Sequence, residues 1–158
     1  MAGRRTVIGV MGGGSADAAT LALAEELGRR IAEAGWTLLT GGRPAGVMEA
    51  ASRGAARAGG LVVGVLPDRS PAAANQWVEL AIASGLNDAR NLINVLSSEV
   101  VVACPGGAGM LSEVALALKN ACMPDDARTI ADINRALDAI DRCSRVTGVP
   151  GRLARFCG

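Results

Sequence analysis

The chain has 158 residues, of which 50% are hydrophobic and 20% are charged, a composition that fits one compact globular domain and excludes a disordered chain. Its 16 basic and 15 acidic residues nearly cancel, so no overall field would attract nucleic acid or an anionic membrane. The sequence contains no histidine, no tyrosine and a single lysine, Lys119, which excludes a Ser-His-Asp or Cys-His catalytic system and a Walker A loop.

Strand and helix patterns alternate from the start of the chain. Residues 6–11 are apolar and partly β-branched, and they predict a buried strand that runs into the glycine turn 12–14. Residues 16–34 carry apolar side chains at helical spacing and predict an amphipathic helix, capped near Ser15 or Asp17. Its outer side offers two i,i+4 ion pairs, Glu25 with Arg29 and Glu26 with Arg30.

The same alternation continues as far as Asn120. Further strands are predicted over 36–40, 61–67 and 100–104, with a less regular strand inside 77–85, and further helices over 45–58, 87–98 and 109–120. Short, continuously apolar strands between helices indicate an α/β, doubly wound, Rossmann-like domain with a mainly parallel sheet and helices on both faces. In such sheets, ligands bind beyond the carboxyl ends of the strands.

The pattern weakens after Asn120. A helix is predicted over 126–142, where acidic residues suit a helix N-terminus, and residues 143–158 are interpreted as a C-terminal tail. The expected domain, which binds a nucleotide or phosphate, therefore spans 1–142.

Several absences predict a cytoplasmic protein without membrane contact. No apolar stretch approaches the length of about 18 residues that a membrane span needs, and the N-terminus does not resemble a signal peptide. The four cysteines are far apart and form no CxxC pair, which fits reduced thiols better than a disulfide framework or a zinc site. No metal site is predicted.

Three glycine clusters follow predicted strands, at 12–14, 41–42 and 106–109, so they are expected to converge on one cleft. Glycine lets the backbone approach an anion closely, and the N–H groups at a helix start favour negative charge. Tight turns without a ligand are the alternative explanation, but three converging loops favour a phosphorylated or nucleotide-like ligand. A dinucleotide site is not expected, because Asp17 stands where its third glycine belongs.

Glu113 lies in the helix predicted over 109–120, which is apolar on nearly all sides and is therefore expected to be buried. Two interpretations stay open. Glu113 complements the helix dipole in the first turn, or it is held beside a sugar, where it stabilises an oxocarbenium-like centre or activates water. Arg43 and Arg90 are cations near the predicted cleft, and Arg90 is preferred because an apolar helical segment follows it.

These residues resemble the LOG-like, Rossmann-type family, which is related to cytokinin-activating phosphoribohydrolases and includes bacterial nucleotide-binding proteins and molybdenum cofactor carriers. The segments that carry the resemblance are "VMGGGSAD", "TLLTGGRPAGVMEAA", "GGLVVGVLP", "NDARN" and "PGGAGMLSEVALALK". The resemblance implies that Glu113 is the catalytic glutamate, that Arg90 assists it, and that the last glycine loop binds phosphate. It implies cleavage of the N-glycosidic bond of a nucleoside 5′-monophosphate, no metal or organic cofactor, and a homo-oligomer, often a dimer.

The sequence departs from the hydrolase pattern at two pocket positions. Met110 stands where the motif has threonine, and Asn91 stands where the hydrolases have lysine. The chain also lacks the apolar strand that family members place after the helix that holds Glu113, which leaves open a sheet truncated at its C-terminal edge. Three functions therefore stay open: a phosphoribohydrolase; a non-catalytic carrier of the molybdenum cofactor or sensor of a nucleotide; or a structural or regulatory domain with a degenerate site. Around the catalytic candidates Glu113 and Arg90, the predicted binding set is Gly12, Gly13, Gly14, Ser15, Gly41, Gly42, Asn91, Gly106, Gly107, Gly109 and Met110.

Overall fold

The structure is a computed structural model, and it describes residues 3–120, 143–146 and 154–157. The strands are β1 (Val7–Met11), β2 (Thr37–Thr40), β3 (Val62–Leu66), β4 (Leu80–Ala83), β5 (Val100–Ala103), β6 (Cys143–Val146) and β7 (Ala154–Cys157). The helices are α1 (Ala18–Glu33), α2 (Gly46–Arg57), α3 (Arg90–Leu96) and α4 (Ala108–Asn120), with short 3-10 turns η1 (Pro71–Ala73) and η2 (Asn87–Ala89). The expected α/β order is confirmed.

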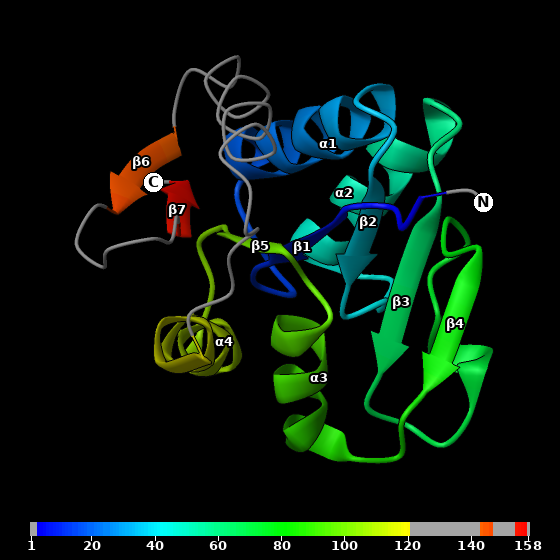
Figure 1. The fold of residues 1–158 in the computed structure, drawn as a ribbon, viewed down its shortest axis with the longest axis vertical. Helices are drawn as coiled ribbons and strands as arrows, with labels where there is room; N and C mark the ends of the chain where they lie inside the picture. Colours follow the sequence, from blue (N-terminus) through cyan, green and yellow to red (C-terminus); the bar gives the residue numbers. More distant parts are fainter. Residues whose placement is uncertain (1–2, 121–142, 147–153, 158) are drawn as a thin grey trace.

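The sheet has the strand order β4-β3-β2-β1-β5-β7-β6, and β1 to β5 are all parallel. The chain builds outward from β1 through β2 and β3 to β4, and then crosses to the other side of β1 to form β5 (Figure 1). The strand order therefore reverses between β1 and β5. In open α/β sheets a ligand crevice forms at such a reversal, beyond the carboxyl ends of the two strands.

Two layers of helices cover the sheet, as a doubly wound domain requires (Figure 1). On one face, Ile8 and Val10 pack against side chains of α1 and α2, such as Leu27 and Val47. On the other face, β1 and β5 pack against α3 and α4 through a second cluster, whose helical members include Val95 and Ala117. This division follows from the pleat, because successive residues of a buried strand point to opposite faces.

The strand that pairs with β5 comes from the end of the chain. β7 lies parallel to β5, and β6 pairs antiparallel with β7, so both strands fall within the segment 143–158 that the sequence analysis interprets as a tail. The edge of β5 is thus paired by β7. The helix predicted over 126–142 lies outside the described residues, and the domain boundary at 142 stays a prediction.

The backbones of helices α1 and α2 lie in direct contact, because each helix has a glycine at the point where they cross. A Cβ added to Gly28 would lie 2.0 Å from the carbonyl oxygen of Ala51, and one added to Gly54 would lie 1.9 Å from that of Glu25. The close approach changes the predicted ion pairs. Glu25 does not pair with Arg29 but reaches α2, where Arg53 lies 2.7 Å away, whereas the pair between Glu26 and Arg30 is confirmed at 2.7 Å.

The start of α1 is fixed by Asp17, one of the two predicted caps. The N–H of Thr20 donates to Oδ1 of Asp17 at 2.7 Å, and Asp17 has extended backbone angles. This is the usual N-cap arrangement, which satisfies one of the unpaired N–H groups at a helix start.

Candidate functional site

The glycine loops after β1, β2 and β5 converge, as the sequence predicts. The N–H of Gly13 donates to the carbonyl oxygen of Pro105 at 3.0 Å, which ties the loop after β1 to the loop after β5. One glycine from each cluster lines a common pocket of about 100 Å³, formed by Val10, Met11, Gly12, Gly41, Met48, Asp88, Arg90, Asn91, Gly109, Met110 and Glu113. Sites that enclose a whole ligand measure about 300–1,000 Å³, so a nucleotide-sized molecule fits only with part of it outside.

Arg90 and Glu113 face each other across this pocket. Nη1 of Arg90, at the start of α3, lies 3.7 Å from Oε1 of Glu113 on α4, and the two side chains are only 15% and 8% exposed. The guanidinium lies over the end of β2, because a Cβ added to Gly41 would come within 2.6 Å of Nη1. The missing side chain of Gly41 therefore makes the space that Arg90 occupies.

Burial dominates the electrostatics of both groups. Burial lowers the pKa of Arg90, and the nearby charge of Arg43 lowers it further, while Glu113, Asp88 and Asp68 favour its charged form. Arginine keeps its charge in proteins even so. Nε of Arg90 is buried and has no hydrogen-bond partner among the described residues. The pocket therefore holds a desolvated cation with unused donor capacity.

Glu113 is buried, as predicted. It does not complement the dipole of α4, which was one of its two expected roles. It is 6% exposed and lies beyond the first turn of α4, which contains no acidic residue, so the dipole interpretation is wrong. Burial raises the pKa of Glu113, whereas a hydrogen bond from Asn94 and the charge of Arg90 lower it. Nδ2 of Asn94 donates to Oε1 at 2.8 Å. Because burial has the largest effect, the carboxyl group of Glu113 keeps its proton to a higher pH than an exposed glutamate does.

The expectation that α4 is buried on all sides is wrong. Glu113 and Ala117 lie on its buried side, whereas Leu111 is 61% exposed and Ala115 is also exposed. The helix covers the β5 side of the sheet with one face only. The sequence did not show this difference because its apolar residues surround the helix almost evenly.

Asn91 and Met110 both line the pocket, next to the start of α4. Nδ2 of Asn91 donates to Oγ of Ser112 at 2.8 Å and approaches the carbonyl oxygen of Gly109 at 3.5 Å. Asn91 therefore ties α3 to the first turns of α4. Met110 presents an apolar thioether side chain, and Met48 adds a second one from α2.

The predicted glycines fall into two groups. Close packing accounts for the first: a Cβ on Gly12 would lie 2.7 Å from Cβ of Val47, one on Gly106 would lie 2.7 Å from the nitrogen of Gly13, and Gly42 has a positive φ of 73°. The second group has free space. A Cβ on Gly107 or Gly109 would meet nothing within 4 Å. Packing therefore gives no reason for glycine at the start of α4.

The other members of the predicted set lie outside the pocket lining. Gly13, Gly14 and Ser15 continue the loop after β1, and Gly14 and Ser15 are exposed. Gly42, Gly106 and Gly107 likewise do not line the pocket. Arg43, a candidate in the sequence, forms an ion pair of 3.1 Å with Asp68 and does not reach the pocket.

Sequence reasoning missed Asn94, Met48 and Asp88. Asn94 carried a usable signal, because it is polar within the apolar segment "LINVL" and lies four residues after Arg90, on the same side of a helix. Met48 and Asp88 gave no such signal, since Met48 reaches the pocket from the start of α2 and Asp88 from the short turn before α3, and both positions depend on how these elements pack.

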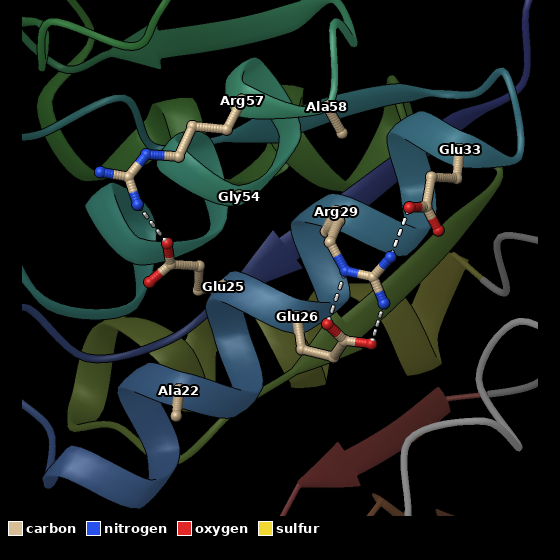
Figure 2. Close-up of a pocket in the computed structure, with 8 residues that line it drawn as sticks. All are labelled: Ala22, Glu25, Glu26, Arg29, Glu33, Gly54, Arg57 and Ala58. Atoms are coloured by element: carbon tan, nitrogen blue, oxygen red, sulfur yellow. Dashed lines mark hydrogen bonds and ion pairs between the residues drawn. The ribbon is translucent and has the colours of Figure 1, made fainter.

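A second hollow lies between α1 and α2, on the other side of the molecule from α3 and α4 (Figure 2). Every charged residue that lines it is already paired. Glu25 pairs with Arg57, and Arg29 pairs with both Glu26 and Glu33. The guanidinium of Arg57 also lies 5.4 Å from the ring centre of Trp77. These groups stabilise the contact between the two helices and leave no unmatched charge for a ligand.

The described part of the chain offers no cluster of metal ligands, and its Cys104 thiol is poorly placed to react. Residues 3–120, 143–146 and 154–157 contain no group of three or more His, Cys, Asp or Glu residues that would hold a metal ion. Cys104 is buried next to the last glycine loop, and burial raises the pKa of its thiol to about 12. In the same described part, no helix combines the length and the apolarity needed to cross a membrane.

The sequence matches a known family over most of this architecture. A family model described as the SLOG cluster4 family covers residues 5–123, which include the whole pocket. The chain belongs to the SLOG cluster4 family. This assignment confirms the LOG-like family that the motifs suggested, and the glycine loops, Arg90 and Glu113 all lie inside the matched region.

Relatives of this SLOG cluster4 protein include two with molybdenum cofactor in their names. The molybdenum cofactor binding protein of Rippkaea orientalis is 48% identical, with a TM-score of 0.74 over 87% of this chain and 88% of that one. The molybdenum cofactor carrier protein of Chlamydomonas reinhardtii is 47% identical, with a TM-score of 0.66 over 74% of this chain and 72% of that one.

A third relative is an enzyme. The cytokinin riboside 5′-monophosphate phosphoribohydrolase of Mycobacterium tuberculosis is 34% identical over 97 residues, which are 60% of this chain and 51% of the relative. This match spans only about half of that enzyme. It agrees with family membership and carries less of the relative's chain than the matches to the carrier proteins do.

Proposed function

We propose that this SLOG cluster4 protein binds a phosphorylated pterin of the molybdopterin class and carries it without turnover. The observation that carries the proposal is the free space at Gly107 and Gly109, where packing does not require glycine. These residues lie at the start of a 13-residue helix, α4, whose first N–H groups attract an anion. Gly109 and Arg90 line the same pocket, so a phosphate bound at this helix start would share the pocket with the guanidinium.

The pocket composition supports a ligand with one anionic end and a flat, weakly polar remainder. Among the described residues that line the pocket, Arg90 is the single cation, and Met48 and Met110 add apolar side chains beside it. Thioethers make favourable contacts with ring systems and adapt to irregular shapes. The similarity to the two molybdenum cofactor proteins points to the same ligand class.

A second candidate function is hydrolysis of a nucleoside 5′-monophosphate, and the pair of Arg90 and Glu113 favours it. In that reaction the bond between the base nitrogen and C1′ of the ribose breaks, and a hydroxyl from water joins C1′. The proton from that water goes to the departing base. Glu113 would accept the proton from water or stabilise positive charge on the sugar, as carboxylates do in glycoside cleavage.

Calorimetry with three probes tests the proposal: molybdopterin, AMP and inorganic phosphate. We expect molybdopterin to bind most tightly, and Arg90→Gln to weaken binding by at least tenfold, the loss of one hydrogen bond to a charged group. Arg43→Gln is the matched control, because it removes a nearby cation that does not line the pocket. Equal loss in both variants, or no binding of any probe, would contradict the proposed site.

Incubation of the wild-type protein with AMP decides between the two functions. We expect AMP to stay intact during long incubation, whereas a phosphoribohydrolase releases adenine and loses that activity in Glu113→Gln. Adenine release would support the second candidate function and overturn the carrier function.

Two expectations from the sequence, a homo-oligomer and a cytoplasmic location, stay predictions.

A further inference from the structure

Asn94 lies beneath the pocket and is not part of its lining. It is fully buried, at 0% exposure, on α3 four residues after Arg90, so both side chains leave the helix on the side that meets Glu113. Its surroundings are otherwise apolar or soft: Sδ of Met11 is 3.9 Å from Nδ2, and Val95 is its buried neighbour.

The amide is not fully satisfied at this position. Nδ2 donates to Oε1 of Glu113 at 2.8 Å, whereas Oδ1 is buried and has no partner among the described residues. Burying an unpaired polar atom costs stability, and an apolar side chain of similar size would avoid the cost. Within the described part of the chain, the hydrogen bond to Glu113 is the contact of this side chain that accounts for an amide here.

The hydrogen bond also separates the roles of Arg90 and Asn94. Nη1 of Arg90 is 3.7 Å from Oε1, which is an ion pair but too long for a hydrogen bond. Asn94 supplies the hydrogen bond instead. The guanidinium therefore keeps its donors for other acceptors.

We propose that Asn94 is a positioning residue of the pocket, which holds Oε1 of Glu113 so that Oε2 faces the ligand and Arg90 stays free to bind it. The part of this proposal that concerns a ligand rests on the proposed function. The hydrogen bond between Asn94 and Glu113 does not rest on the proposed function, so the contact and the ligand role can each fail without the other.

Titration of the Glu113 carboxyl group by carbon NMR tests the contact, with the resonance assigned from its absence in Glu113→Gln. In Asn94→Leu the hydrogen bond to the carboxylate is lost, and we expect Glu113 to bind a proton about tenfold more tightly. Arg90 faces Glu113 directly, and Asp68, Asp88 and Arg43 act on Arg90, so all four stay unchanged in the test.

Ser98→Ala is the matched control. Oγ of Ser98 donates to the backbone carbonyl of Asn94 at 2.7 Å, so this variant also removes a buried hydrogen bond at the same place without touching the carboxyl group. We expect its Glu113 titration to match that of the wild-type protein. A shift of equal size in Asn94→Leu and Ser98→Ala would overturn the proposal, and so would no shift in either.

Two further measurements keep the test decisive if Asn94→Leu does not fold. Asn94→Asp keeps the shape but replaces the donor by an acidic oxygen, so the last proton should leave the carboxyl pair at higher pH than it leaves wild-type Glu113. In the wild-type protein, the side-chain N–H₂ resonances of Asn94 should move with the titration of Glu113. Resonances that do not respond would overturn the contact without any variant.

Binding of AMP then tests the ligand part of the proposal. With Asn94→Leu folded, we expect at least a tenfold loss of AMP affinity at pH 7 and wild-type affinity in Ser98→Ala. A normal affinity together with a shifted titration would overturn the positioning role. If AMP does not bind the wild-type protein, the same comparison is made with molybdopterin, with the same expected loss in Asn94→Leu. If neither probe binds the wild-type protein, the proposed function fails, while the NMR result still decides the contact.

Discussion

The variant Gly41→Ala tests how ligand binding depends on the position of the Arg90 guanidinium, because it moves this group without removing its charge. A Cβ at Gly41 would lie 2.6 Å from Nη1 of Arg90 and 2.8 Å from Sδ of Met48. Ordinary contact begins at 3.4 Å, so the guanidinium must withdraw by about 0.8 Å, the difference between 3.4 and 2.6 Å. Both contacted atoms are the ends of flexible side chains, so the backbone does not have to move.

The variant should therefore stay folded and lose affinity. Rotating a side chain away from its preferred angle costs about 0.5–1.5 kcal/mol, so displacing two should lower the free energy of unfolding in urea by at most about 3 kcal/mol. A displaced guanidinium loses a hydrogen bond to a charged ligand, worth about 1.5–3 kcal/mol, or about 10- to 100-fold in affinity. Calorimetry with molybdopterin and with AMP measures this loss.

A double-mutant cycle provides the control. In a protein that already carries Arg90→Gln, we expect Gly41→Ala to cause no further loss, because its effect passes through the guanidinium. A folded Gly41→Ala protein with wild-type affinity would refute the reasoning. An equal loss in the presence and absence of Arg90 would assign the effect to Met48 or to the backbone instead.

Three more predictions concern packing and titration. Gly28→Ala should lower the free energy of unfolding by about 1–3 kcal/mol in urea, because its Cβ would lie 2.0 Å from a backbone oxygen of α2. Glu113→Gln should remove a pH dependence: burial raises the pKa of Glu113, so wild-type stability falls as pH rises from the ordinary value of 4.5 through that raised pKa, and the variant should gain over the wild type across this window in urea melts. The Cys104 thiol, with its pKa raised to about 12, should resist iodoacetamide at pH 8 in the folded protein, as measured by peptide mass spectrometry.

Each of these three has an internal control. Gly107→Ala places a Cβ in open space and should leave the free energy of unfolding unchanged, so equal effects at Gly28 and Gly107 would contradict the packing argument. For Glu113→Gln, a constant difference from the wild type between pH 4 and pH 8 would show that Glu113 does not titrate differently on folding. Cys104 should react once urea unfolds the chain, and equally fast reaction in the folded state would disprove its burial.

The fold could be predicted from the sequence because its signals are local. Short, continuously apolar strands such as 100–104 are stable only in a sheet that is covered by helices on both faces. The face that a helix buries was harder to predict. On α4, apolar residues lie on all sides, so the exposure of Leu111 depends on which side the sheet lies, and that is set by the rest of the molecule.

The pocket was predicted only in part, because several of its contacts join residues far apart in the sequence. Convergence of the glycine clusters followed from the rule for parallel sheets. The position of Arg90 over Gly41 and the pairing of Glu25 with Arg53 did not follow, since both depend on contacts between elements. Intrahelical spacing suggested Arg29 as the partner of Glu25, and the closer approach of α2 provided a better one.

Two residues that depart from the hydrolase pattern change the pocket in the same direction. Asn91 stands where the resemblance places a lysine, and its amide bonds to Oγ of Ser112 at 2.8 Å, so it fixes α4 instead of adding a cation. Met110 stands where the resemblance places a threonine, and it brings a thioether in place of a hydroxyl donor. The pocket thus keeps the pair of Arg90 and Glu113 but lacks the neighbouring cation and the hydroxyl donor to phosphate of the hydrolase pattern. Weaker control of the phosphate affects turnover more than binding, because reaction requires the sugar to be placed within a few tenths of an ångström and binding does not. This is the physical reason to favour a carrier over a hydrolase.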